Sequence, residues 1–139
     1  MNTTQPTSIL YTMLRVSDLD RSLEFYCNVL GMAEIRRETF TQGRFTLVFV
    51  GYSDAPGEPL IELTHNWDQD AYTHGSGYGH IALSVADIHA TCERLDANDV
   101  KILRAPGPMK MAVDETGLRE VIAFIQDPDG YRIELIQTP

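Results

Sequence analysis

The sequence has 139 residues, the length of one domain or of two small modules that share a core. Hydrophobic residues make up 43% of the chain and charged residues 22%, a composition typical of globular proteins rather than disordered or fibrous ones. The formal net charge of -9 repels a phosphate backbone, so we expect no nucleic-acid partner.

The sequence carries no signal for export or for a membrane. It contains no apolar stretch of about 18 residues, and the N-terminal MNTTQPTS lacks the basic and apolar regions of a secretory signal. We therefore expect a cytoplasmic protein without a membrane partner. Cys27 and Cys92 lie far apart with no metal or redox spacing, and we interpret them as ordinary buried thiols.

The first half of the chain predicts a strand, a helix and three further strands. ILYTMLRV forms the first strand, and Ser17 or Asp18 caps a helix of about three turns that ends at Gly31. Turn residues then separate three extended runs, at 33–38, 44–51 and 59–64.

The second half repeats this order. YGHIALSV is a strand, a helix starts near Asp87, and VKIL, EVIAFIQ and YRIELI are strands, with DPDG as the last turn. We therefore predict an α+β fold in which two βαβββ modules, 9–66 and 78–138, form curved mixed sheets with helices on the outside. The modules make up a single domain that covers residues 1–139.

Strand alternation predicts which side chains share a face of each sheet. Superposing the modules places Tyr11 on His80 and Glu62 on Glu134, all on the face opposite the apolar side chains. Arg15 shares the face of Tyr11. One imidazole and two carboxylates are donors that a divalent first-row metal accepts. Taken singly, each of these residues is as readily explained as an ordinary strand or core residue, so both interpretations stay open.

Seven segments resemble the glyoxalase I (lactoylglutathione lyase) family of the vicinal oxygen chelate superfamily: TMLRV, FYCNVLGM, FVGY, IELTHNW, YGHIALSV, VIAFIQDPDGY and IELI. The resemblance extends from about residue 9 to 137. It implies a fold of the glyoxalase, bleomycin-resistance and dioxygenase type. It also implies isomerisation of the hemithioacetal of methylglyoxal and glutathione to S-D-lactoylglutathione. The N-terminal extension and the loop 110–120 look unlike the compact bacterial form.

The resemblance also implies a metal site shared between two subunits of a homodimer. The family's ligands map onto Tyr11 and Glu62 of one chain and onto His80 and Glu134 of the other. Short bacterial members work with nickel or cobalt rather than zinc, so we expect one of those metals. By the same resemblance Glu134 is the catalytic base and moves off the metal as substrate binds, while Glu62 serves the other face of the substrate.

Glutathione, as part of the substrate, needs cations to hold its carboxylates. The family's glutathione-binding arginine and asparagine map onto Arg15 and Asn66. Lys110 and Arg119 flank a loop that could close over the glycine carboxylate, and we include them among the substrate-binding residues.

Tyrosine at position 11 departs from the family, which has histidine there in bacterial enzymes and glutamine in the eukaryotic type. A phenol has a reference pKa of about 10, so a metal must displace a proton to bind it. Three outcomes stay open: the phenolate binds, a water replaces it, or the site has lost its metal. We favour three protein ligands, Glu62, His80 and Glu134, completed by water or weakly by Tyr11.

Two alternative functions follow from this departure. The first is a metal-free protein of the same fold that binds a small molecule. The second is a related glutathione- or thiol-dependent metalloenzyme with an altered metal site. The presence of two glutamates argues against a ring-cleaving dioxygenase.

Overall fold

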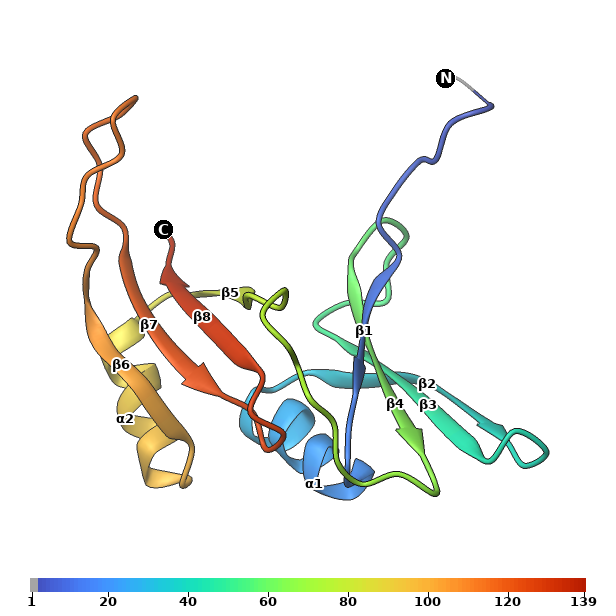
Figure 1. The fold of residues 1–139 in the computed structure, drawn as a ribbon. Coiled ribbons are helices and arrows are strands. Elements are labelled where there is room, and N and C mark those ends of the chain that lie inside the picture. Colours follow the sequence, from blue (N-terminus) through green and yellow to red (C-terminus); the bar gives the residue numbers. More distant parts are fainter. Residues whose placement is uncertain (1–2) are drawn as a thin grey trace. The chain divides into compact units, whose positions relative to one another are not determined.

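The computed structural model describes residues 3–139 and divides the chain into two compact units, Met1–Thr73 and His74–Pro139. Each unit contains one four-stranded sheet and one helical segment (Figure 1). The predicted α+β class with two successive βαβββ units is confirmed.

Unit 1 places its first strand beside its last. The elements are β1 (Tyr11–Arg15), α1 (Leu19–Leu23), η1 (Glu24–Val29), β2 (Ala33–Phe40), β3 (Phe45–Gly51) and β4 (Leu60–Asn66). The strand order is β1-β4-β3-β2, with β1 parallel to β4 and the other pairs antiparallel. The helical segment between β1 and β2 therefore forms a crossover connection.

The helix of unit 1 begins as the sequence predicts and then widens. The Asp18 carboxylate caps α1 by accepting from the Arg21 backbone N–H at 3.1 Å. From Glu24 the helix continues as the π-helix η1, and Gly31 ends it with a φ of 79°. Phe25 and Tyr26 are both buried in this widened segment. The predicted helix of about three turns is present, but apolar spacing does not distinguish a π-helix from an α-helix, so the sequence did not predict the widening.

Unit 2 repeats the topology with a regular helix. The elements are β5 (Ile81–Val85), α2 (Ile88–Ala97), β6 (Lys101–Pro108), β7 (Val121–Gln126) and β8 (Arg132–Gln137). The order is β5-β8-β7-β6, and β5 runs parallel to β8. Asp87 caps α2 by accepting from the Ala90 backbone N–H at 3.1 Å. In the part of the chain from residue 3 onward, no helix has the length and apolar character needed to span a bilayer.

The core of each unit lies between its sheet and its helix, and burial of each large apolar side chain contributes about 1.5–3 kcal/mol. In unit 1 the buried apolar side chains include Leu14, Val48, Val50, Ile61 and Leu63 of the strands, and Val16 just after β1. In unit 2 the buried apolar residues include Ile88, Leu95, Ile125, Ile133 and Leu135. Because strands alternate, the opposite face of each sheet holds the predicted site residues.

Three aromatic rings hold the segment that leads to His80 against the start of β8. His74 stacks on Tyr131 with ring centroids 4.0 Å apart, and the edge of Tyr78 contacts the same ring at 5.2 Å. The Tyr78 hydroxyl also donates to the Arg132 carbonyl at 2.9 Å. These contacts determine where His80 enters the sheet.

This packing predicts an unusual titration for Tyr78. Burial, and then the charges of Asp127 and Tyr131, raise the pKa of Tyr78 to about 12. Folding therefore favours the neutral phenol. The resulting contribution to the free energy of unfolding is fully present below a pH of about 10 and is lost as the pH rises through 12. Spectrophotometric titration should show a tyrosine step near pH 12 that Tyr78→Phe lacks. A difference spectrum between the two proteins with its midpoint near pH 10 would contradict this assignment.

Candidate functional site

The sheet of unit 1 brings Tyr11 and Glu62 to the face away from its helix. Met13 pairs with Glu62, and Glu62 pairs with Phe49, so these three side chains form one row across the sheet. The Tyr11 ring contacts Phe49 edge-on at 5.1 Å with an interplanar angle of 73°. Glu62 is only 6% exposed and accepts a hydrogen bond from the Thr64 hydroxyl at 2.8 Å.

The sheet of unit 2 makes the equivalent arrangement. Ala82 pairs with Glu134, which pairs with Phe124. The His80 ring contacts Phe124 edge-on at 5.3 Å and 79°, and its Nε2 lies 3.2 Å from Oε1 of Glu134. Tyr11 and His80 therefore occupy equivalent positions of the two sheets, as do Glu62 and Glu134.

The donor chemistry of these positions fits a divalent metal. Glu62 is a buried carboxylate, and no cationic side chain pairs with it among residues 3–139. Burial of such a charge is costly without a counter-ion. Within the same residues no three His, Cys, Asp or Glu side chains gather closely enough to hold one ion. Each unit thus presents two of the four predicted ligands.

The two glutamates differ in how firmly they are held. Thr64 lies two residues beyond Glu62 and fixes its carboxylate, whereas the equivalent residue in unit 2 is Ile136, which has no hydroxyl to donate. Glu134 contacts the His80 ring, whose nitrogen would face the metal instead once an ion is bound. Glu134 is therefore the carboxylate whose orientation is less constrained by the protein.

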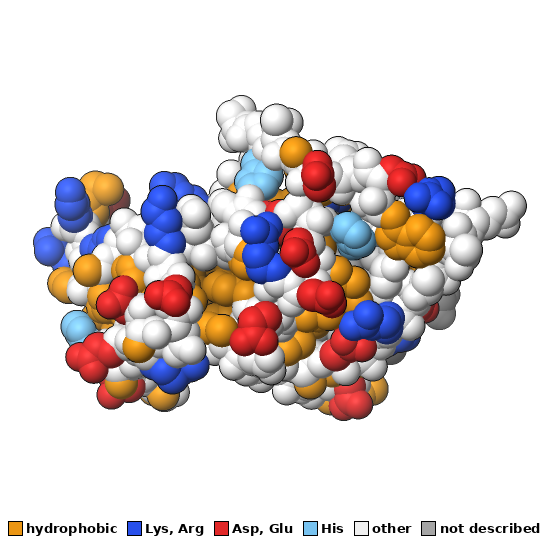
Figure 2. All heavy atoms as spheres, turned by 90° about the horizontal axis from the view of Figure 1, so that it is seen from below, with side chains coloured by type: hydrophobic (Ala, Val, Ile, Leu, Met, Phe, Trp, Pro, Cys, Tyr) orange, Lys and Arg blue, Asp and Glu red, His pale blue; other side chains and the backbone are white. Residues whose placement is uncertain are grey.

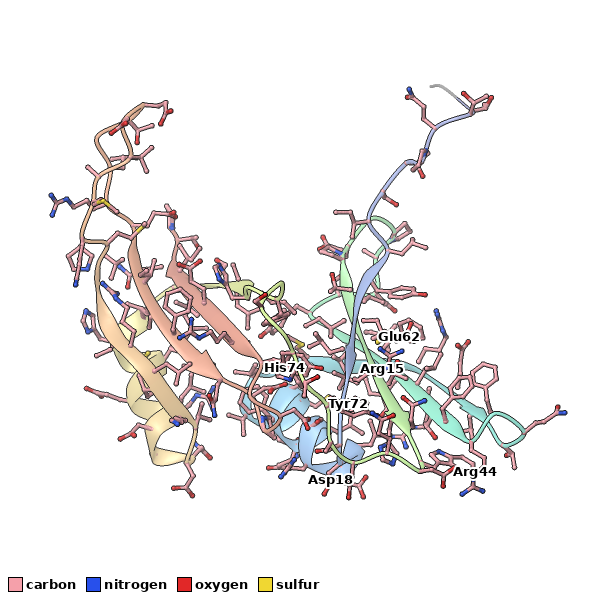
Figure 3. All side chains as sticks on the ribbon, viewed as in Figure 1. Arg15, Asp18, Arg44, Glu62, Tyr72 and His74 are labelled. Atoms are coloured by element: carbon pink, nitrogen blue, oxygen red, sulfur yellow. The ribbon has the colours of Figure 1, made fainter. Side chains whose placement is uncertain are left out.

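A polar pocket of about 740 Å³ lies in unit 1 and is lined in part by Arg15 and Asn66. Figure 3 labels three of its lining residues, Arg15, Arg44 and Tyr72. Asn66 Oδ1 accepts from the Tyr72 hydroxyl at 3.3 Å, which orients the amide. The remaining lining residues are Gly43, Arg44, Asp68, Gln69, Ala71 and Thr73. Glu62 and Asn66 share a face of β4 four residues apart, so about 13 Å of strand separates them.

Unit 2 does not repeat the polar groups of this pocket. The positions equivalent to Arg15 and Asn66 hold Ser84 and Thr138, whose hydroxyls contact each other. The pocket is therefore a feature in which the two units have diverged.

Other predicted substrate-binding residues are not among those that line the pocket. Lys110 and Arg119 belong to unit 2, on the exposed segment between β6 and β7, where Met109 N–H donates to the Glu120 carbonyl at 2.9 Å. Their contact with substrate stays a prediction. His65 Nδ1 lies 3.4 Å from the Val16 carbonyl.

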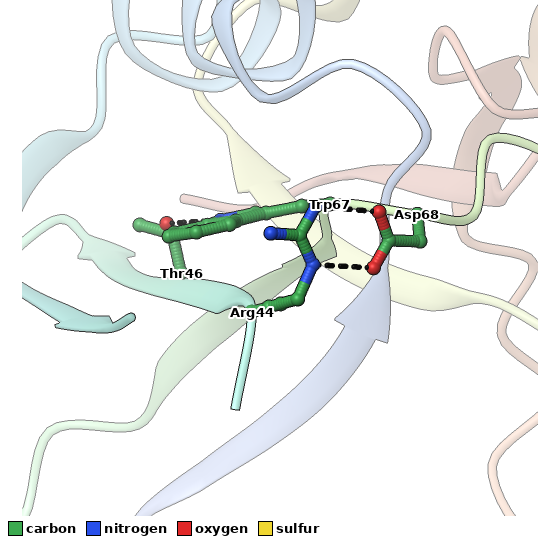
Figure 4. Close-up of polar contacts among 4 residues, drawn as sticks. All are labelled: Arg44, Thr46, Trp67 and Asp68. Atoms are coloured by element: carbon green, nitrogen blue, oxygen red, sulfur yellow. Dashed lines mark hydrogen bonds and ion pairs between the residues drawn. The ribbon is translucent and has the colours of Figure 1, made fainter. Parts of the chain in front are cut away.

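Sequence reasoning missed two charged residues of the pocket, Arg44 and Asp68. Arg44 donates to both carboxylate oxygens of Asp68 at 2.7 Å, and its guanidinium lies 5.5 Å from the Trp67 ring centroid (Figure 4). Twenty-four positions separate the partners. The segments that contain the two residues, TQGR and HNWDQD, have no sequence pattern that predicts this pairing.

Basic residues do not gather into a continuous patch on the face shown in Figure 2. Acidic and basic side chains are interspersed there, with apolar groups between them. The acidic side chains on this face are in keeping with the net charge of -9.

Comparison with known proteins identifies one superfamily over nearly the whole chain. The sequence model of the Glyoxalase/Bleomycin resistance protein/Dioxygenase superfamily matches residues 8–135. A probable lactoylglutathione lyase of Synechocystis sp. is 52% identical over 130 residues, which are 94% of this chain and 95% of the relative. The lactoylglutathione lyase of Haemophilus influenzae is 50% identical over 129 residues, or 93% and 91% of the two chains.

Solved structures give the same result. Glyoxalase I from Zea mays superposes with a TM-score of 0.86 at 37% identity and covers 94% of this chain. This chain spans only 44% of the maize protein. The trypanothione-dependent glyoxalase I of Leishmania major superposes with a TM-score of 0.78 at 39% identity, covering 95% of this chain and 87% of its own.

Proposed function

Because the chain belongs to the glyoxalase/bleomycin resistance protein/dioxygenase superfamily, and within it to the lactoylglutathione lyases, we propose that it isomerises the methylglyoxal–glutathione hemithioacetal to S-D-lactoylglutathione. The observation that carries the proposal is an arrangement repeated in both sheets, in which a ring donor and a glutamate lie beside one phenylalanine. We further propose that the two units form one domain and that the protein works in the cytoplasm.

The enzyme is one that requires a divalent metal and takes glutathione as part of its substrate. We propose Glu62, His80 and Glu134 as ligands, with the fourth position beside Tyr11 completed by water or only weakly by the Tyr11 hydroxyl. Nickel or cobalt is the metal that we propose, because the Synechocystis and Haemophilus relatives, which are 52% and 50% identical to this chain, are bacterial. When bound, such a cation supplies stabilisation of the negative charge that develops on the substrate oxygens.

Glu134 is the residue that best fits the role of base. Isomerisation of the hemithioacetal requires removal of a proton from a carbon next to a carbonyl and its return to the neighbouring carbon. Glu62 is held by the Thr64 hydroxyl, whereas the contact of Glu134 is with a ring that is itself a proposed ligand. Glu134 can therefore turn toward the substrate, while Glu62 keeps its place on the other side.

The pocket of unit 1 is where we place the glutathione moiety. Arg15 offers a guanidinium to a carboxylate, and the Asn66 amide offers hydrogen bonds to the peptide groups. The strand distance of about 13 Å between Glu62 and Asn66 allows a tripeptide to reach from the metal ligands into the pocket. Lys110 and Arg119 remain candidates for the second carboxylate.

A prediction for the base follows. Glu134→Gln keeps the size of the side chain but removes its basicity, so turnover of methylglyoxal plus glutathione should fall at least about a hundredfold. Binding of S-hexylglutathione, measured by calorimetry, should stay within about threefold of wild type because the pocket of unit 1 is intact. Turnover close to that of wild type would assign the proton transfer to Glu62 or to water.

A second prediction tests the proposed homodimer with shared sites. Glu62→Gln and His80→Ala alter ligands in different units, so each pure variant should be nearly inactive. If each site combines unit 1 of one subunit with unit 2 of the other, refolding a mixture creates heterodimers in which one site is intact. About a quarter of the wild-type activity should then return. Sites completed within one chain would give no recovery, and a protein that sediments as a fully active monomer would also exclude the proposal.

A third prediction concerns Tyr11. Tyr11→His places an imidazole next to Phe49, in the same edge-to-face contact that His80 makes with Phe124. Imidazole is a neutral electron-pair donor at pH 7, so no proton has to be displaced before it binds a metal. Affinity for nickel or cobalt should rise by roughly tenfold in calorimetric titration. Tyr11→Phe, which keeps the ring and removes the hydroxyl, should bind metal as wild type does. Weaker binding in both variants would identify Tyr11 as an adapted ligand.

A further inference from the structure

The ion pair between Arg44 and Asp68 is built into the wall of the pocket in unit 1. Arg44 lies in the turn before β3 with a φ of 58°, and its carbonyl accepts from the Trp67 backbone N–H at 3.0 Å. The Trp67 indole in turn donates to the Thr46 hydroxyl at 3.0 Å and lies beside the Arg44 guanidinium (Figure 4). Backbone, ring and carboxylate thus fix the position of one guanidinium.

Stability of the fold does not account for this pair. The side chains of Arg44 and Asp68 are 58% and 67% exposed, and ion pairs in such surroundings add little to the free energy of folding. Both residues instead line the pocket that contains Arg15 and Asn66. The hydrogen bonds from Arg44 lower the pKa of the Asp68 carboxyl, which keeps it ionised.

The charges of the pocket wall do not fit a ligand that is only an anion. Arg15 and Arg44 are cationic, whereas Asp68 would repel a nearby carboxylate. A carboxylate offers about four lone-pair positions, and Arg44 uses one on each oxygen of Asp68. Asp68 therefore retains acceptor capacity on the part of its surface that is open to the pocket.

An α-amino acid group matches this arrangement, because it carries an ammonium and a carboxylate on the same carbon. Resting on the proposed function, we propose that Asp68, positioned by Arg44, binds the ammonium group at the γ-glutamyl end of the substrate. Arg15 then takes the neighbouring carboxylate, and charges of opposite sign alternate from Arg15 through the ligand to Asp68 and Arg44. The glycine end of glutathione has no ammonium and does not satisfy Asp68.

The experiment compares two ligands that differ in one group. S-hexylglutathione and its analogue without the α-amino group, S-hexyl-N-glutarylcysteinylglycine, are titrated into the purified full-length protein. Calorimetry gives the affinities, and the fluorescence of Trp67, the one tryptophan of the sequence, reports binding at the pocket wall. The proteins compared are wild type, Asp68→Asn and Asp70→Asn. Asp70 is exposed, lies two residues away and is absent from the lining, so its variant is a matched control for charge.

We expect wild type and Asp70→Asn to bind the amino ligand at least about fivefold more tightly than the desamino ligand, and Asp68→Asn to bind the two within about twofold. Equal affinities in wild type, or a preference retained in Asp68→Asn, would overturn the role of Asp68 while leaving the isomerase intact. Failure of wild type to bind S-hexylglutathione, together with absent turnover, would overturn the proposed function and this inference with it.

Discussion

The parallel pairing of the first and last strand within each unit is the constraint on which the candidate site depends. In unit 1 this pairing sets Glu62 beside Met13 and so puts Tyr11 on the same face as Glu62. In unit 2 it sets Glu134 beside Ala82 and so puts His80 on the face of Glu134. A shift of one residue in either register would turn the glutamate into the apolar layer and expose Ile61 or Ile133. Burial of that apolar layer against the helix is therefore what holds the polar groups on the opposite face.

The two units share this framework but have specialised in different tasks. Unit 1 fixes its glutamate with Thr64 and follows it with the pocket of Arg15 and Asn66. Unit 2 has Ile136, Ser84 and Thr138 at the corresponding positions, and Glu134 contacts the His80 ring. In the proposed enzyme unit 1 thus contributes most of the ligand recognition that the structure displays, and unit 2 contributes the base.

Much of this arrangement could be predicted from the sequence because it follows from short-range patterns. Period-two alternation in LIELT and RIELI was enough to assign the faces of Glu62 and Glu134, and cap residues located the starts of both helices. The π-helical segment escaped prediction because its apolar spacing matches an α-helix. Asp68 and Arg44 escaped because their pairing depends on a left-handed turn and on two segments that only the folded sheet brings together.

Support of the two ring donors by phenylalanine has a consequence for how the duplicated copies can evolve. Phe49 makes an edge-to-face contact with a phenol and Phe124 makes the same kind of contact with an imidazole, so this arrangement accommodates both rings. An exchange between them is expected to be nearly neutral for folding while it alters the affinity for metal. The strands of each sheet also form their ladder hydrogen bonds with strands of the same unit. In the proposed metal site, a substitution at position 11 can therefore alter the affinity for metal while His80 in the other unit stays unchanged.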